Sequence, residues 1–220
     1  MTLARKLLRI FPALLLYSLG IYLNIQADIG LAPWEAFHSG VSIAVGLSFG
    51  NVVLLAGLAI LLIDLLLKEK IGLGTVLNIT LVGKGVDLYQ FLNLIPKAGS
   101  ILAGTLLLLT GQFLICLATY LYISAGLGSG PRDSLMVALG KRLPRVPVGA
   151  IRALLEGTAL FIGWSLGAKV GLGTIVAVLS IGPIMQLTFR AMRFEVRDVR
   201  HESIADTLRL LRKHQLKSET

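Results

Sequence analysis

Six long apolar segments separate the charged residues of this chain, and they constrain its fold more than any other feature. The segments lie near residues 7–27, 48–67, 73–95, 100–124, 148–167 and 172–190. A helix needs roughly 20 residues to cross a hydrocarbon core of about 30 Å. Each segment is long enough, so the sequence predicts an all-α bundle of membrane-spanning helices.

Composition agrees with a membrane environment. The chain has 220 residues, of which 55% are hydrophobic and only 15% charged, against roughly 25% charged residues in soluble domains. Eight of the 21 Lys and Arg residues lie in residues 190–220, and most of the others flank apolar segments. The net charge of +9 therefore indicates membrane topology, and we expect neither a soluble enzyme nor a nucleic-acid-binding protein.

Two shorter segments, 33–45 and 131–143, each begin at a proline. As helices of this length they would reach only ~20 Å, which is too short to cross comfortably. Proline suits the first helical position because its missing N–H would have no partner there. The preceding residues 28–32 and 126–130 are predicted breaks in the helical structure.

The distribution of positive charge favours six crossings with both termini in the cytoplasm. Without the tail, six crossings put nine Lys and Arg residues inside and only Lys97 and Lys169 outside. Eight crossings, in which the short helices also span, would leave seven inside and four outside. The positive-inside rule prefers the first arrangement.

The chain contains an internal repeat. At an offset of 98 residues, Gly30, Pro33 and Glu35 fall on Gly128, Pro131 and Asp133, and at an offset of 99 the Gly-Leu-Gly-Thr run 72–75 falls on 171–174. We predict one membrane repeat at 1–98, a second at 99–190, and a charged amphipathic tail at 191–220. Each repeat has three crossings, so the second inserts upside down, a pattern typical of secondary transporters.

Two pairs of charged residues lie within predicted spanning helices. Lys84 and Asp87 are three residues apart in the third span, and Arg152 and Glu156 are four apart in the fifth. Charges at such positions are costly unless they are paired or face water. They are candidates for a transport pathway, and the alternative is that each pair neutralises itself and orients its helix.

The two proline motifs supply the remaining candidate residues. Pro33 and Glu35 match Pro131 and Asp133, with Arg132 and, in the first motif only, His38 nearby. Each acid falls in a first helical turn, where the helix dipole favours negative charge. The short-helix N-termini could instead offer N–H groups to an anionic group of a substrate, with Arg132 adding positive charge. His38 is either a proton relay or an interfacial residue.

Enzyme and cofactor signatures are absent from the sequence. There is no G-x-S-x-G, H-E-x-x-H or P-loop motif. Cys116 is the only cysteine and lies in an apolar run, which rules out an intramolecular disulfide and a cysteine metal cluster. We therefore expect no catalytic residues, no metal and no cofactor.

The motifs carry a family resemblance. The stretch Gly30–Glu35 with His38, the stretch Gly126–Asp133 and the run Gly171–Thr174 resemble the bacterial YczE-like membrane proteins, which are related to the YitT group. The resemblance implies a multispan protein of the bacterial cytoplasmic membrane. It supplies no substrate.

Two functional hypotheses follow. The first is a small transporter or channel-like protein that moves a small solute or ion between the two halves. The second is a membrane scaffold that recruits a cytoplasmic partner through its basic segments and tail. The expected partners are lipid and, for the first hypothesis, the solute; a homo-oligomer is left open.

Overall fold

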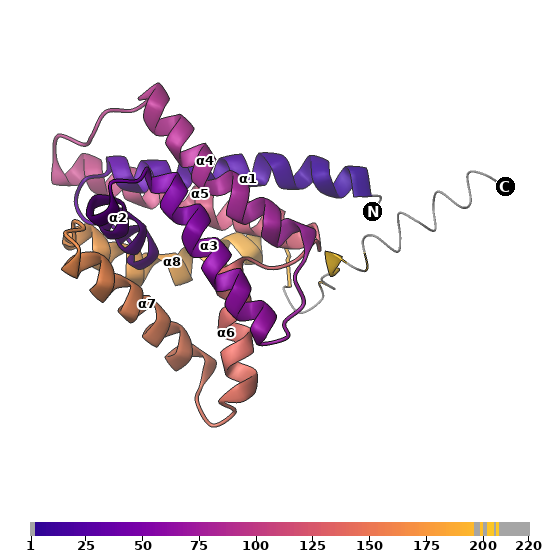
Figure 1. Cartoon of the computed structure of the whole chain (residues 1–220). Helices are drawn as coiled ribbons and strands as arrows, with labels where there is room; N and C mark the ends of the chain where they lie inside the picture. The colour runs from indigo at the N-terminus through magenta and orange to yellow at the C-terminus, as the bar shows by residue number, and fades with distance from the viewer. Residues whose placement is uncertain (1–2, 196–198, 200–201, 205, 207–220) are drawn as a thin grey trace.

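The computed structural model describes residues 3–195, 199, 202–204 and 206, and within them the chain forms eight helices and no strand (Figure 1). The helices are α1 (Leu3–Gln26), α2 (Pro33–Val45), α3 (Phe49–Leu66), α4 (Leu73–Leu92), α5 (Ile101–Ser124), α6 (Pro131–Arg142), α7 (Val148–Ser165) and α8 (Leu172–Ala191). The all-α prediction is confirmed. Both short helices, α2 and α6, begin at the prolines that predicted them.

Four of these helices, α1, α3, α5 and α8, are long and apolar enough to cross a membrane. Helices α4 and α7 have sufficient length, but they carry the Lys84–Asp87 and Arg152–Glu156 pairs and are less apolar. The chain is therefore a membrane protein with several apolar helices. The predicted amphipathic helix of the tail falls mostly outside the described residues.

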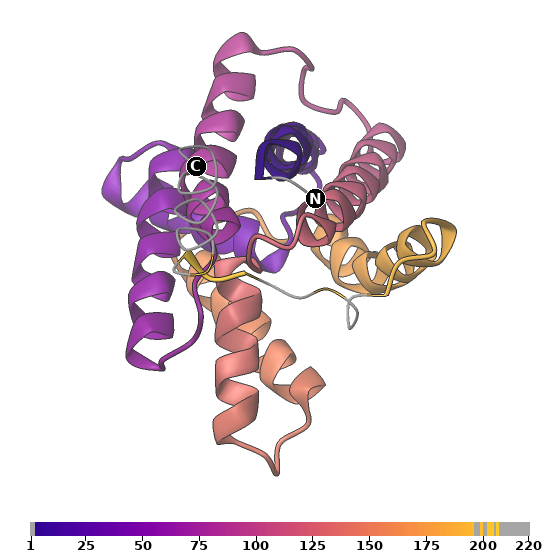
Figure 2. The same ribbon diagram turned by 90° about the vertical axis from the view of Figure 1, so that its right-hand side faces the viewer.

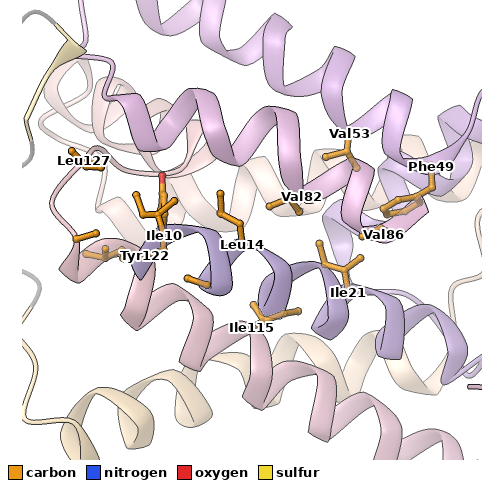
Figure 3. Close-up of a cluster of buried hydrophobic side chains, with 13 residues drawn as sticks. Ile10, Leu14, Ile21, Phe49, Val53, Val82, Val86, Ile115, Tyr122 and Leu127 are labelled. Carbon is orange, nitrogen blue, oxygen red and sulfur yellow. The ribbon is translucent and has the colours of Figure 1, made fainter. Parts of the chain in front are cut away.

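Helix α1 lies at the centre of the bundle, where it packs between α4 and α5 (Figure 2). Its buried side chains meet those of both neighbours in one apolar cluster (Figure 3). The cluster includes Ile10, Leu14, Ile21, Phe49, Val53, Val82, Val86, Ile115, Tyr122 and Leu127. Small residues bring the backbones close, since a Cβ added to Gly20 would lie 2.7 Å from the carbonyl oxygen of Gly111, and close backbone approach is the usual source of helix association in lipid.

The two breaks dock on helix starts that are far away in the sequence. The carbonyl oxygen of Ile29, before α2, accepts a hydrogen bond of 2.8 Å from the N–H of Gly173 at the start of α8. The carbonyl oxygen of Leu127, before α6, accepts one of 2.7 Å from the N–H of Gly74 at the start of α4. The first N–H groups of a helix have no intrahelical partner, so each break satisfies a donor that its host helix leaves unpaired.

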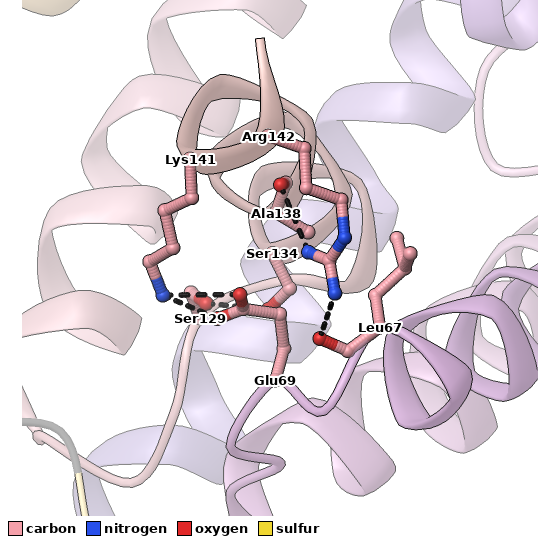
Figure 4. Close-up of polar contacts among 7 residues, drawn as sticks. All are labelled: Leu67, Glu69, Ser129, Ser134, Ala138, Lys141 and Arg142. Atoms are coloured by element: carbon pink, nitrogen blue, oxygen red, sulfur yellow. Dashed lines mark hydrogen bonds and ion pairs between the residues drawn. The ribbon is translucent and has the colours of Figure 1, made fainter. Parts of the chain in front are cut away.

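Two groups of ion pairs and hydrogen bonds connect loops of the chain. Asp28 lies 3.0 Å from the ammonium of Lys169 and 3.6 Å from that of Lys97. The hydrogen bond from Lys169 holds the pKa of Asp28 below its ordinary value, so this group stays ionised at neutral pH. In the second group, Lys141 contacts Glu69 at 2.7 Å, and Arg142 donates to the carbonyl oxygen of Leu67 at 2.6 Å (Figure 4). These contacts tie the end of α6 to the loop between α3 and α4.

The packing of α2 on α7 gives a test of the fold. A Cβ added to Gly163 would collide with the backbone of Ala36, so we expect Gly163→Val to lower the free energy of unfolding by about 1–3 kcal/mol. Gly157→Val, in the same helix but with nothing within 4 Å of its added Cβ, should have little effect. Thermal unfolding in detergent, followed by circular dichroism, measures the difference. Equal losses in the two variants would contradict this packing.

Candidate functional site

A cavity of about 820 Å³ lies among helices from both halves of the chain. Seven helices contribute residues to its wall, namely α1, α2, α4, α5, α6, α7 and α8, and so does the loop between α3 and α4. Its volume falls in the range of small-molecule sites, roughly 300–1,000 Å³. Apolar and aromatic side chains such as Ile21, Ile115, Ile181 and Phe189 form much of the wall.

The structure divides the residues singled out from the sequence into two sets. The first set lines the cavity and consists of Pro33, Glu35, Pro131, Arg132, Asp133, Arg152 and Glu156. The second set, Lys84, Asp87 and His38, does not line it. The proline motifs and the Arg152–Glu156 pair are thus brought together, whereas the Lys84–Asp87 pair lies elsewhere.

The starts of the two short helices meet at the cavity. The guanidinium carbon of Arg132, the second residue of α6, lies 4.9 Å from the centre of the Trp34 ring, the second residue of α2. Such a distance is typical of a cation–π contact. Trp34 and Arg132 also occupy matching positions of the repeat. Within the described part of the chain, the Arg132 guanidinium has no hydrogen-bond acceptor.

Glu35 caps its own helix. One carboxylate oxygen accepts a hydrogen bond of 3.0 Å from the side-chain amide of Asn24, and the other accepts one of 3.3 Å from the N–H of Ala32. The residue is 7% exposed, so its carboxylate is nearly enclosed. An acid in this position compensates the positive end of the α2 dipole.

A buried amide on α5 adds an unsatisfied polar atom to the cavity wall. Gln112 is 2% exposed, and no hydrogen bond reaches its side-chain oxygen from any described residue. Buried acceptors without a partner are costly. A donor from a bound molecule would remove that cost.

Arg152 and Glu156 form an ion pair on the α7 wall of the cavity, with 2.9 Å between Nε and Oε1. The pair therefore neutralises itself while facing the cavity. The sequence suggested a place on a transport pathway and neutralisation within the pair as alternatives, and the geometry allows both.

Lys84 and Asp87 instead join α4 to the start of α3. Asp87 accepts hydrogen bonds of 2.7 Å from the Ser48 hydroxyl and from the N–H of Gly50, and Lys84 donates to the Asn51 side chain at 2.6 Å. Asp87 thereby caps the first turn of α3 from a neighbouring helix. Lys84 and Asp87, which the sequence suggested as one pair, instead make three separate hydrogen bonds between α4 and α3.

His38 is 3% exposed and enclosed by aromatic rings. Its ring centre lies 5.5 Å from that of Phe37, 5.7 Å from Phe49 and 6.2 Å from Trp34. Of these rings, only Trp34 lines the cavity. His38 does not line it but packs against the Trp34 ring.

Asp64, in α3, was missed by the sequence interpretation. It is fully buried, and both of its carboxylate oxygens lack a hydrogen-bond partner among the described residues. The signal that could have identified it is a single acid inside the otherwise apolar segment 48–67. Burial of a carboxyl without hydrogen-bond partners is costly, so Asp64 is not expected to stabilise the fold.

The two halves differ in how their third and fourth helices pack. Gly50 of α3 and Gly83 of α4 touch, since a Cβ added to Gly83 would lie 2.5 Å from the Gly50 carbonyl oxygen. At an offset of 99 residues, the corresponding Gly149 and Gly182 have nothing within 4 Å of an added Cβ. Helices α7 and α8 accordingly lack the close packing that joins α3 to α4, and residues of both line the cavity.

The contrast between Asp87 and Asp64 is testable with one conservative change. Asp87→Asn should lower the free energy of unfolding by about 1–3 kcal/mol, because it weakens two hydrogen bonds to a charged acceptor. Asp64→Asn should shift the unfolding temperature much less, because no described residue donates a hydrogen bond to that carboxyl. Thermal unfolding of both variants in the same detergent measures these shifts. A loss of stability in Asp64→Asn equal to that in Asp87→Asn would show that Asp64 has partners of its own.

Comparison with known proteins gives the family. Residues 4–190 match a family of unknown function designated DUF6198. The chain is 31% identical to the uncharacterised membrane protein YczE of Bacillus subtilis over 180 residues, which cover 81% of this chain and 82% of YczE. It is 32% identical to an uncharacterised protein of Haemophilus influenzae over 79% of this chain and 78% of that protein. It is 29% identical to YyaS of Bacillus subtilis over 79% and 87% of the two chains.

No solved structure matches the chain. The family match extends from the first residues of α1 to the end of α8 and so includes every residue of the cavity wall. The chain therefore belongs to the family of YczE-like membrane proteins.

Proposed function

We propose that the protein is a small transporter that exposes its central cavity to the two sides of the membrane in turn. The observation that carries this proposal is the difference between the two halves. One pair of helices, α3 and α4, is closed at Gly50 and Gly83, while the corresponding pair, α7 and α8, is open at Gly149 and Gly182. A transporter built from two inverted repeats alternates by exchanging two such arrangements around one site.

The reciprocal docking of the breaks supports the inverted repeat. Ile29 and Leu127 precede the two short helices, and they bind the starts of α8 and α4, respectively. The break of each repeat, 1–98 or 99–190, thus binds the start of a helix in the other repeat. The match extends to conformation, because Gly30 and Gly128 have φ values of +125° and +120°.

The contacts also support an orientation. Under the positive-inside rule, Lys68, Lys70 and Lys141 belong to the cytoplasmic side, and these residues lie on the cavity wall. Asp28, Lys97 and Lys169 then belong to the opposite side. We therefore assign the closed α3–α4 seam to the outward route and the open α7–α8 seam to the cytoplasmic route.

In this mechanism, Asp87 and Lys84 stabilise the closed α3–α4 seam. Their bonds to Ser48, Gly50 and Asn51 hold α3 against α4. Opening the cavity to the outside requires these bonds to break, while α7 approaches α8. Arg152 and Glu156 move with α7 and stay paired.

Disulfide trapping tests the alternation. Residues 51 and 84 are in contact across the closed seam, whereas 149 and 182 are apart. In a Cys116→Ala background, we expect Asn51→Cys with Lys84→Cys to form a disulfide readily. Gly149→Cys with Gly182→Cys should form one only when the cavity closes to the cytoplasm. Electrophoresis under non-reducing conditions detects both.

The decisive sample is the quadruple variant that carries both cysteine pairs. Once the 51–84 disulfide has formed, the 149–182 disulfide should no longer form, because the two seams close in different states. Gly157→Cys with Gly182→Cys, which pairs the same two helices at another position of α7, is a matched control for nonspecific disulfide formation. If the 149–182 disulfide never forms, or forms equally in the locked protein, the two halves do not alternate, and the scaffold hypothesis becomes the better one.

The proposed orientation has its own test. Lys97, Lys141 and Lys169 have side chains that are 67%, 61% and 57% exposed. Single cysteines at positions 97 and 169 should react with a membrane-impermeant maleimide in intact cells, and a cysteine at 141 should react only after permeabilisation. The wild-type chain is the control, because Cys116 is buried. Labelling of position 141 together with 97 would exclude the inverted arrangement.

A further inference from the structure

We infer that the cavity binds a small zwitterion, a molecule with a carboxylate, an ammonium group and an apolar portion. The inference rests on the proposed function, in that the transported solute occupies this cavity. The charge, the hydrogen-bonding groups and the apolar wall of the cavity support it.

Arg132 provides the place for the carboxylate. Its guanidinium stacks on Trp34 at the edge of the cavity and has no hydrogen-bond acceptor among the described residues. A guanidinium presents its donors as a planar fork that matches the two oxygens of a carboxylate.

Gln112 and Glu35 provide the place for the ammonium group. The Gln112 oxygen is buried, lines the cavity and lacks a donor from the described residues. Glu35 lines the same cavity, and each of its carboxylate oxygens accepts one hydrogen bond, which leaves room for a further donor. An ammonium group carries three donors and no acceptor, and so complements both.

The balance of charge distinguishes a zwitterion from a simple ion. The whole cavity wall carries five basic residues and four acidic ones, namely Lys68, Lys70, Arg132, Lys141 and Arg152 against Glu35, Glu69, Asp133 and Glu156. Arg152 and Glu156 cancel each other. Among the described residues, a simple anion would leave the Gln112 oxygen without a donor, and a simple cation would leave Arg132 without an acceptor. A zwitterion matches both signs and adds no net charge, which matters because charges interact strongly away from water.

The wall beyond these groups is apolar. The apolar part of the wall includes Val178, Ile181, Met185 and Phe189 of α8, together with Ile115 and Ile21. Burial of an apolar group against such a wall favours binding. Leucine, methionine and phenylalanine are therefore suitable probes.

Trp34 can report binding directly. The chain has two tryptophans, and only Trp34 lines the cavity, so Trp164→Phe leaves a single reporter. In this background we expect L-leucine to change the Trp34 fluorescence in a saturable way. Isovalerate, which lacks the carbon of leucine that bears the ammonium group, and isoamylamine, which lacks the carboxylate, should each bind at least tenfold more weakly.

Two variants assign the two ends of the ligand. Arg132→Gln should weaken leucine and isovalerate at least tenfold and leave isoamylamine unchanged. Gln112→Leu should weaken leucine and isoamylamine and leave isovalerate unchanged. Arg145→Gln is the matched control, because Arg145 is exposed and does not line the cavity.

The alternative outcomes are informative. Isovalerate binding as tightly as leucine would make the site an anion site, and isoamylamine binding as tightly would make it a cation site. Absence of binding by leucine, methionine and phenylalanine would also overturn the inference. Disulfide trapping needs no ligand, so seams that alternate without binding these probes would refute the zwitterion alone, whereas seams that do not alternate would refute transport itself.

Discussion

The need to pair backbone polar groups in an apolar environment governs this structure. Lipid offers no hydrogen bonds, so a break in a helix is tolerated there only where other protein groups pair the exposed N–H and C=O groups. The chain breaks twice, before Pro33 and before Pro131, and each break is paired by the start of a helix from the other half. Fold and cavity are therefore coupled, because the contacts that satisfy the breaks also bring the two short helices together.

Glycine determines where the helices can approach and where they can separate. Gly20 and Gly111 bring α1 against α5, and Gly163 brings α7 against α2. These contacts hold the centre together in a bundle whose outer surface is apolar. The glycine pairs 50–83 and 149–182 have the same spacing but different surroundings, so equivalent sequences occupy two arrangements in one molecule.

The charged residues fall into three groups: those that bond two helices together, those that cap a helix and those that line the cavity. Asp87 and Lys84 bond across the α3–α4 seam, Glu35 caps α2, and Arg132 lies over Trp34 at the cavity. Apart from the fully buried Asp64, the acids in the helices described above have specific donors or cationic partners. This agrees with the high cost of isolated charges in lipid, and it makes the Arg132 guanidinium, which lacks an acceptor within the described residues, the natural starting point for a binding site.

The sequence by itself determined the helical class, the helix starts at Pro33 and Pro131, the spacing of the repeat and the family, because hydrophobic length and proline geometry act over a few turns of chain. Only the tertiary structure decided that Lys84 and Asp87 bond to α3 outside the cavity, that Arg132 stacks on Trp34, and that Asp64 and Gln112 keep unpaired oxygens. Spacing along one helix tells which residues share a face, but not which helix lies opposite. Identical glycine spacings in the two halves could not predict one closed and one open seam, since that difference depends on how whole helices pack.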